Sequence, residues 1–167
     1  EIKKYSIFYI LDISNLFNKI KRSFFMDFEK KGYEKEYNGK NIIITGGLGF
    51  IGSNLAHKLV ELNPNKIVII DALIKNHGGS IKNIRGIEDK LEVPYANNGL
   101  NINDRRVINY LEGIDYVFNL AGSVRHIDSK NDPLTDLELN LTSHVAFLDF
   151  CKDYVRAFLN RSDRIPL

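Results

Sequence analysis

The residues best placed to do chemistry are three glycines within the stretch Thr45–Gly52 (TGGLGFIG). Gly46, Gly49 and Gly52 follow a short apolar run and open a helical pattern, so they lie between a strand and a helix. Gly46 permits the tight turn, the missing side chain of Gly49 leaves room for a phosphate, and Gly52 lets the helix pack on the sheet. The N–H groups and dipole of the helix N-terminus attract phosphate oxygens. The spacing therefore predicts a site for the pyrophosphate of a dinucleotide.

A carboxylate after the next apolar run supports this interpretation. Asp71 follows Ile67–Ile70 and lies about 20 residues beyond the glycines, where a ribose-binding acid is expected. A carboxylate at this position accepts hydrogen bonds from both ribose hydroxyls and repels a 2′-phosphate, which favours NAD over NADP. The alternative role for Asp71 is that of a helix- or turn-capping residue.

The elements that must hold these residues alternate between strand and helix patterns. We expect strands at residues 42–44, 67–70, 91–95 and 116–120, and helices at residues 50–62, 81–87, 104–111 and 133–154. Pro64 ends the first helix, and Pro133 opens the last. Asn103 or Asp104 caps the helix at residues 104–111. This alternation predicts an α/β fold, a Rossmann-type parallel sheet with helices on both faces.

Three segments of the chain differ in composition. Residues 1–40 form an N-terminal extension, in which residues 5–25 show apolar side chains at helical spacing. Residues 41–154 are expected to form the dinucleotide-binding domain, and residues 155–167 an irregular C-terminal tail. The apolar part of the extension is interrupted by polar residues, falls short of the ~20 apolar residues of a membrane span, and has no signal-peptide cleavage site. No membrane partner and a cytoplasmic location are the resulting expectations.

Charge and cysteine content exclude several classes of function. The formal net charge is +2 over 167 residues, which is too small to indicate nucleic acid or an anionic membrane as a partner. Cys151 is the only cysteine, so no internal disulfide can form. Its apolar neighbours favour a small core residue over a reactive thiol. No pair of His, Cys or acidic residues has the spacing of metal ligands, so no metal is expected.

These motifs together resemble the extended short-chain dehydrogenase/reductase family, and within it the NAD-dependent sugar-nucleotide epimerases and dehydratases. The likeness covers about residues 41–151 and rests on TGGLGFIGSNL, IVIID and DYVFNLAG. It implies a full-length parent that oxidises the sugar of a nucleotide-sugar with bound NAD, as in 4-epimerisation or 4,6-dehydration. The resemblance also allows a homodimer of that parent.

The resemblance extends the predicted cofactor site beyond the glycines and Asp71. Asn101 stands where the family usually has an aspartate at the adenine, and Ala72 stands where it often has an asparagine. In full, the further residues implied at the cofactor are Phe50 and Ile51 (pyrophosphate), Asn101 and Ile102 (adenine), Leu120, Ala121 and Gly122 (nicotinamide ribose), and Asn140.

Other polar residues have weaker claims. Ser123 and His126 follow the nicotinamide edge, where the family places side chains that contact the sugar. His57 and His144 fall on expected helices, and we interpret them as surface or packing residues.

The catalytic pair of that family does not occur in this sequence. The family uses a Tyr-x-x-x-Lys pair, in which the tyrosine exchanges a proton and the lysine lowers its pKa. No tyrosine here is followed by a lysine four positions later. We therefore expect a sheet truncated after about four strands, with no catalytic residue. Two functions remain open: the NAD-binding portion of an epimerase or dehydratase, or a non-catalytic dinucleotide-binding module that acts as a sensor or partner subunit.

Overall fold

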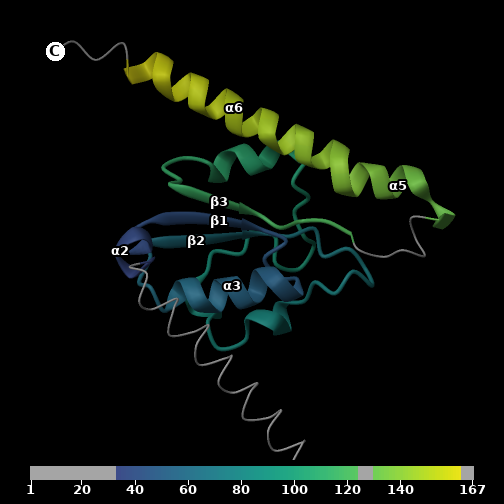
Figure 1. Cartoon of the computed structure of the whole chain (residues 1–167), viewed down its shortest axis with the longest axis horizontal. Coiled ribbons are helices and arrows are strands. Elements are labelled where there is room, and N and C mark those ends of the chain that lie inside the picture. Colours follow the sequence, from purple (N-terminus) through teal and green to yellow (C-terminus); the bar gives the residue numbers. More distant parts are fainter. Residues whose placement is uncertain (1–32, 124–129, 163–167) are drawn as a thin grey trace, which may run out of the picture. The chain divides into compact units, whose positions relative to one another are not determined.

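The computed structural model describes residues 33–123 and 130–162, with side chains described up to residue 156. The chain divides into two units, residues 1–37 and residues 38–167. In the first unit, the described element is the short helix α2 (Tyr33–Tyr37). The helix expected at residues 5–25 lies outside the described residues. The second unit contains the sheet and the helices that surround it (Figure 1).

Three parallel strands form this sheet. The strand β1 lies between the other two, and the bounds are β1 (Asn41–Thr45), β2 (Lys66–Ile70) and β3 (Tyr116–Asn119). In the register, Ile43 lies opposite Val68 on one side and Val117 on the other. The apolar runs expected at residues 42–44, 67–70 and 116–120 are thereby confirmed as neighbouring parallel strands.

The prediction of a strand at residues 91–95 is wrong, because this segment forms only a single parallel bridge, between Glu92 and Val68. Two backbone hydrogen bonds, of 2.8 and 2.9 Å, join Glu92 to β2. Pro94 lacks an N–H group and Tyr95 has a φ of 56°, so the pairing does not continue. The described residues therefore contain three strands rather than four. Glu92 nevertheless occupies the place beside β2 that a Rossmann order gives to the next strand.

The helix after the glycine-rich turn, α3 (Phe50–Val60), agrees closely with the expected helix at residues 50–62. It ends before Asn63, which has a φ of 55°, and Pro64. In place of the helix expected at residues 81–87, the structure has a shorter 3-10 turn, η1 (Ile81–Ile84). A second 3-10 turn, η2 (Glu88–Lys90), follows it.

The helix expected at residues 104–111 is the 3-10 helix η3 (Arg105–Tyr110). Of its two candidate caps, Asp104 fills the role, because its carboxylate accepts a hydrogen bond from the N–H of Arg106 at 2.9 Å. Short connecting helices often take this tighter 3-10 form.

The last helical stretch is continuous but not uniform. It passes through α5 (Pro133–Leu137), the π-helical turn η4 (Glu138–Thr142) and α6 (Ser143–Ser162). The prediction of an irregular tail from residue 155 is wrong for residues 155–162, because these residues continue α6. These residues contain no glycine or proline, so nothing in them interrupts the helix. Neither α6 nor any other helix in the described ranges is long and apolar enough to cross a membrane.

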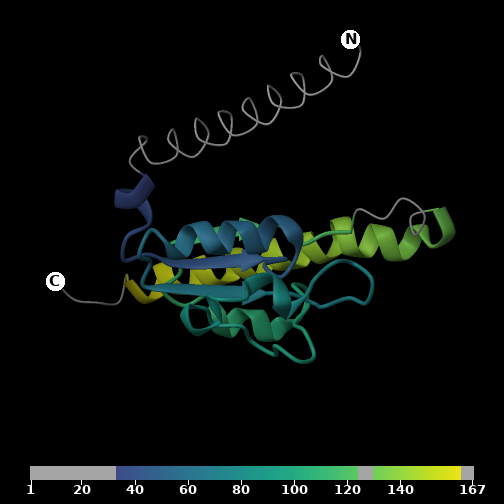
Figure 2. The same ribbon diagram turned by 90° about the horizontal axis from the view of Figure 1, so that it is seen from below.

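Buried side chains cover both faces of the sheet. Ile43 and Val68 belong to a cluster on one face that includes Val107 of η3 and Phe147 of α6. Cys151 packs against this cluster, and burial raises the pKa of its thiol. Figure 2 shows α3 lying along the strands, and α3 contacts β1. Alternate residues of β1 and β2 point to the second face, and those buried there are Ile42, Ile44, Ile67 and Ile69.

Candidate functional site

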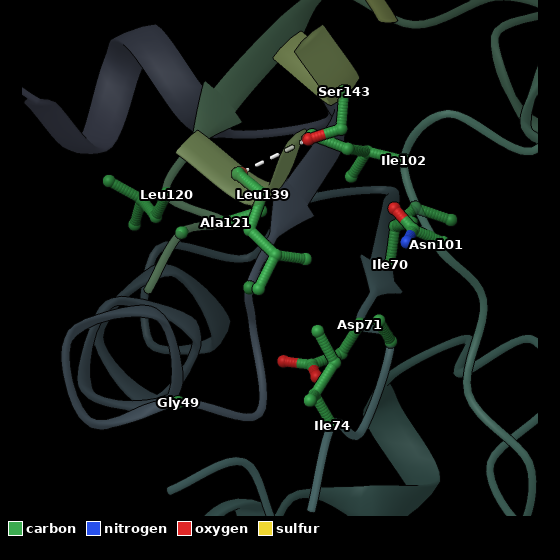
Figure 3. Close-up of a pocket in the computed structure, with 13 residues that line it drawn as sticks. Gly49, Ile70, Asp71, Ile74, Asn101, Ile102, Leu120, Ala121, Leu139 and Ser143 are labelled. Atoms are coloured by element: carbon green, nitrogen blue, oxygen red, sulfur yellow. Dashed lines mark hydrogen bonds between the residues drawn. The ribbon is translucent and has the colours of Figure 1, made fainter. Parts of the chain in front are cut away.

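A pocket opens at the carboxyl edge of the sheet, where the three strands end (Figure 3). Gly46 follows β1, Asp71 follows β2 and Leu120 follows β3, and all three line this pocket. In open parallel sheets, ligands bind in the crevice outside these strand ends. The predicted cofactor residues that the structure brings together here are Gly46, Gly49, Asp71, Asn101, Ile102, Leu120, Ala121 and Gly122.

Two glycines of the turn are required by the fold itself. Gly46 has a φ of 64°, and a Cβ on it would lie 2.7 Å from the carbonyl oxygen of Leu120. A Cβ on Gly52 would lie 2.3 Å from the carbonyl oxygen of Gly46. Side chains at these positions would therefore collide with the backbone. Gly52 does not line the pocket, and the atoms nearest to its Cβ position belong to Gly46 and Gly47, directly after β1.

Gly49 differs because a side chain there would meet a single backbone atom, and at a longer distance than at Gly46 or Gly52. Its backbone has φ −76° and ψ 177°, angles that any residue adopts. A Cβ on it would approach only the carbonyl oxygen of Gly46, at 3.2 Å. As N-cap of α3, Gly49 offers no side-chain hydrogen bond to the helix. The first N–H groups and the positive dipole end of α3 are left to a ligand, and this corner fits a phosphate.

The first two side chains of α3 lie away from the pocket. Phe50 is 83% exposed and Ile51 is 67% exposed, and neither lines the pocket. A contact of their backbone N–H groups, at the N-terminus of α3, with a phosphate stays a prediction.

The Asp71 carboxylate is held in a fixed orientation. Its Oδ2 accepts a hydrogen bond from the N–H of Leu48, and its Oδ1 accepts one from the N–H of Leu73, both at 2.9 Å. These bonds show the capping role that the sequence left open as an alternative. They do not use all the acceptor positions, because each carboxylate oxygen has two lone pairs. Asp71 thus anchors the glycine turn and still presents acceptors to the pocket, where it is the one charged residue among those described.

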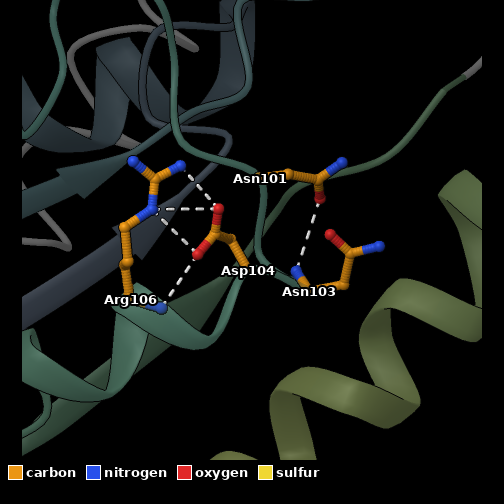
Figure 4. Close-up of polar contacts among 4 residues, drawn as sticks. All are labelled: Asn101, Asn103, Asp104 and Arg106. Atoms are coloured by element: carbon orange, nitrogen blue, oxygen red, sulfur yellow. Dashed lines mark hydrogen bonds and ion pairs between the residues drawn. The ribbon is translucent and has the colours of Figure 1, made fainter.

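Asn101 and Ile102 reach the pocket beside the end of β2. The N–H of Leu100 donates to the carbonyl oxygen of Asp71 at 2.7 Å, which brings the next two residues to the pocket. The Oδ1 of Asn101 accepts a hydrogen bond from the N–H of Asn103 at 3.4 Å (Figure 4). Ile102 is buried. A hydrogen-bond acceptor and an apolar surface therefore meet next to Asp71.

The segment that carries Asn101 is anchored by an ion pair outside the pocket (Figure 4). The Nη2 of Arg106 lies 2.6 Å from the Oδ2 of Asp104. Hydrogen bonds from the Arg106 side chain and then from its backbone N–H lower the pKa of Asp104 to about 2. The Arg106 guanidinium also lies over the Tyr95 ring, 4.6 Å from its centroid. These contacts tie the segment to the turn at Tyr95.

The opposite wall of the pocket is held by a buried threonine. Thr45, the last residue of β1, is 0% exposed. Its Oγ1 accepts hydrogen bonds from the N–H of Leu120 at 3.0 Å and from the N–H of Ala121 at 3.1 Å. The chain leaving β3 is therefore fixed against the end of β1. This role of Thr45 was not predicted from the sequence, in which its position directly before Gly46 is the only signal for it.

Asn140 lies next to the pocket rather than in it. Its Oδ1 accepts a hydrogen bond from the N–H of Ser123 at 2.7 Å, and its Nδ2 donates to the Ser123 carbonyl at 2.9 Å. The same Nδ2 donates to Oδ1 of Asp136 at 3.1 Å. A Cβ on Gly122 would lie 3.2 Å from the Asn140 Oδ1. Asn140 therefore shapes the chain after β3, and its direct contact with a cofactor stays a prediction.

Of the two candidate substrate residues, only Ser123 lies within the described part of the chain. Ser123 lines a second pocket with His77, Asp132 and Thr135. His126 lies outside the described residues. Within the described part of the chain, no three His, Cys, Asp or Glu residues gather in a way that could hold a metal ion.

Several lining residues have no clear signal in the sequence. Leu139 and Ser143 come from the helical stretch after β3 and reach the pocket around the π-helical turn. Ser143 is buried, and its hydroxyl donates to the carbonyl oxygen of Leu139 at 3.1 Å. The remaining three lining residues lie close to Asp71 in the sequence, and this closeness could have indicated them. They are Ile70, Ala72 and Ile74.

Comparison with known proteins finds a family match over most of the chain. Residues 42–162 match the model of the NAD dependent epimerase/dehydratase family. The dTDP-D-glucose 4,6-dehydratase of Dictyostelium discoideum is 31% identical over 119 residues, which cover 69% of this chain and 26% of that protein. A trifunctional UDP-glucose 4,6-dehydratase/UDP-4-keto-6-deoxy-D-glucose 3,5-epimerase/UDP-4-keto-L-rhamnose-reductase of Arabidopsis thaliana is 28% identical over 132 residues, 75% of this chain and 19% of that protein.

Solved structures show the same likeness. The Bordetella bronchiseptica enzyme WbmF, in complex with NAD+, superposes with a TM-score of 0.61 at 28% sequence identity. The match covers 71% of this chain and 34% of WbmF. The chain therefore spans about a fifth to a third of the length of these three proteins.

Proposed function

Because the chain belongs to the NAD dependent epimerase/dehydratase family, we propose that its pocket binds NAD and serves as the cofactor site of a nucleotide-sugar epimerase or dehydratase. The observation that carries this proposal is the missing side chain of Gly49 beside the uncapped N-terminus of α3. A Cβ there would meet only the carbonyl oxygen of Gly46, at 3.2 Å, and would lie where a phosphate approaches the helix.

The other lining residues accommodate the rest of the cofactor in order across the strand ends. The pyrophosphate lies over Gly46 and Gly49, and the adenosine ribose lies on the Asp71 carboxylate. The adenine base lies beyond the ribose, where it contacts the side-chain oxygen of Asn101 and the apolar surface of Ile102. The nicotinamide ribose takes the opposite side, and the residues there are Leu120, Ala121 and Gly122.

Charge favours NAD over NADP at this pocket. The two backbone N–H groups that hold Asp71 keep its carboxylate at the pocket. A 2′-phosphate on the adenosine ribose would face that negative charge. Among the described residues, no lysine or arginine lines the pocket to offset the repulsion. The smaller charge of NAD avoids this conflict.

The proposed parent reaction begins with oxidation of the sugar of a nucleotide-sugar, for which bound NAD supplies the hydride acceptor. The residues of this chain bind and orient that cofactor. The Tyr-x-x-x-Lys pair implied by the family resemblance does not occur among these 167 residues. A second candidate function for the same pocket is a non-catalytic dinucleotide-binding module that acts as a sensor or partner subunit. Tight NAD binding by the stably folded 167-residue protein would support this second function.

Calorimetric titration with NAD tests the proposed site through Gly49. Gly49→Val fills the space that the phosphates need, while its Cβ meets only one backbone oxygen at 3.2 Å. We expect the variant to stay folded and to lose measurable NAD binding. Asn109→Val, which places the same side chain at an exposed position of η3, is the matched control and should bind as the wild type does. Wild-type affinity in a folded Gly49→Val protein would refute the site.

A further inference from the structure

A chain of side-chain hydrogen bonds links the ends of β1 and β3 to the first turn of α6. The Thr45 hydroxyl donates to Oδ1 of Asn119 at 2.6 Å. The Nδ2 of Asn119 lies 2.9 Å from Nδ1 of His144. His144 is partly buried at the second position of α6. Three elements that surround the pocket are therefore connected by three consecutive polar side chains.

Counting protons along this chain determines the state of the imidazole. Thr45 Oγ1 already accepts hydrogen bonds from two backbone N–H groups, so its own proton goes to Asn119. The oxygen of the Asn119 amide faces Thr45, which leaves the NH₂ group facing His144. An amide NH₂ group only donates. The Nδ1 of His144 must therefore accept, and the neutral ring carries its proton on Nε2.

This network acts on the wall of the pocket that faces the glycine turn. A Cβ on Gly46 would lie 2.7 Å from the carbonyl oxygen of Leu120 and 2.8 Å from the backbone N of Ala121, so the two segments are already in close contact. Thr45 holds the same two residues by their N–H groups. If Asn119 turned, Thr45 would lose the acceptor of its own proton, and with it one of the bonds that fix its hydroxyl against the wall.

We propose that His144 is a positioning residue for the cofactor pocket, acting through Asn119 and Thr45 on the Leu120–Ala121 wall. The proposal rests on the proposed NAD site, because it is NAD whose nicotinamide ribose this wall would contact. It also changes the interpretation of His144 from a surface or packing residue to one that accepts a specific hydrogen bond from Asn119.

Two substitutions separate this duty from simple packing. His144→Asn places an amide oxygen where the imidazole Nδ1 lies and can accept from Asn119. His144→Leu has similar bulk and better helix propensity than asparagine but no acceptor. In the leucine variant the exposed Asn119 amide loses the acceptor that holds it in place. The loss of one ordinary hydrogen bond should lower NAD affinity about fivefold, whereas the asparagine variant should stay within about twofold of wild type.

Nuclear magnetic resonance supplies a readout that does not depend on NAD. Long-range ¹H–¹⁵N spectra should show the His144 ring with its proton on Nε2, the signal being assigned by its loss in the variants. Amide exchange at Leu120 and Ala121 should be faster in His144→Leu and unchanged in His144→Asn. A proton on Nδ1, or equal exchange and equal NAD affinity in both variants, would overturn the proposal. If the wild type does not bind NAD, the proposed function fails, and the tautomer and exchange data decide the network alone.

Discussion

Asp71 shows how one side chain at a strand end serves both the fold and a ligand. Its position is predictable from sequence, because a carboxylate after the second strand of such a fold faces the crevice. Its two bonds to the N–H groups of Leu48 and Leu73 are not predictable, since they depend on the path of the loops. The glycines give a related lesson. Their spacing assigns Gly49 to the phosphate and Gly46 and Gly52 to the turn and the helix, and the structure adds the atoms that a Cβ at each position would meet.

Removing the Asp71 carboxylate is expected to change cofactor choice. Asp71→Ala leaves ribose hydroxyls unpaired and lifts the repulsion of a 2′-phosphate. Hydrogen bonds to charged groups are worth ~1.5–3 kcal/mol, so NAD affinity should fall about ten- to a hundredfold and the preference over NADP should shrink or reverse. Calorimetric titration with both cofactors measures this.

Asp71→Asn is the companion variant, because it loses the charge but keeps an acceptor for one of the two backbone N–H groups that Asp71 binds. It should retain more thermal stability than Asp71→Ala while losing preference for NAD. Unchanged NAD affinity in both variants would show that Asp71 is only a cap.

The two kinds of glycine should respond differently to the smallest side chain. Gly52→Ala places a Cβ 2.3 Å from the Gly46 carbonyl oxygen, whereas Gly49→Ala places one at 3.2 Å. Overpacking typically costs ~1–3 kcal/mol, so Gly52→Ala should lower the free energy of unfolding by about that amount. Gly49→Ala should change it little. Urea denaturation compares them, and equal losses would contradict the distinction.

At the scale of elements, long apolar patterns were predictable and local geometry was not. The strands β1, β2 and β3 and the helix α3 follow from β-branched runs and from the glycine turn. The strand expected at residues 91–95 failed, because Pro94 and the positive φ of Tyr95 limit it to one bridge. The π-helical turn that brings Leu139 and Ser143 to the pocket has no signal in the sequence.

The cap of η3 gives a pH prediction at this scale. Hydrogen bonds from Arg106 lower the pKa of Asp104 from 3.8 to about 2 in the folded chain. A lowered pKa means that the ionised carboxylate adds stability above about pH 4, and that this stability is lost as the pH falls toward about 2. Asp104→Asn has no charge to lose. The wild type should therefore be more stable than the variant at neutral pH.

The gap between the two proteins should close through the same acid range. Urea midpoints across that range measure the gap directly, because other titrating groups affect both proteins alike. A gap that stays constant down to about pH 2 would refute the role of the Asp104–Arg106 pair.

At the scale of the whole molecule, the pocket is assembled from segments far apart in the sequence. The ends of three strands, the segment after Leu100 and the turn before α6 all contribute. The family resemblance anticipated most of these segments, and their meeting at one edge follows from parallel strand topology. The chain matches about a fifth to a third of its relatives, so binding and turnover are separate questions for these 167 residues.

We expect a protein of these 167 residues to convert neither UDP-glucose nor dTDP-glucose. Proton transfer by a tuned side chain typically contributes about 10²–10⁴-fold to the rate, and no Tyr-x-x-x-Lys pair supplies it here. Incubation with each nucleotide-sugar and NAD, followed by chromatography of the products, is the measurement. Product above the level of a heat-denatured control would contradict this expectation.

The central claim is that NAD binds at the carboxyl edge of the sheet, and amide chemical shifts during an NAD titration test it most directly. With saturating NAD, we predict that the largest shifts fall in residues 46–52, 71–74, 100–102 and 120–123. The opposite edge of the sheet contains a separate pocket lined by Asn63, Lys66, Asp89 and Glu92, whose amides should stay in place. Shifts concentrated at that edge, or no saturable shifts at all, would contradict the account.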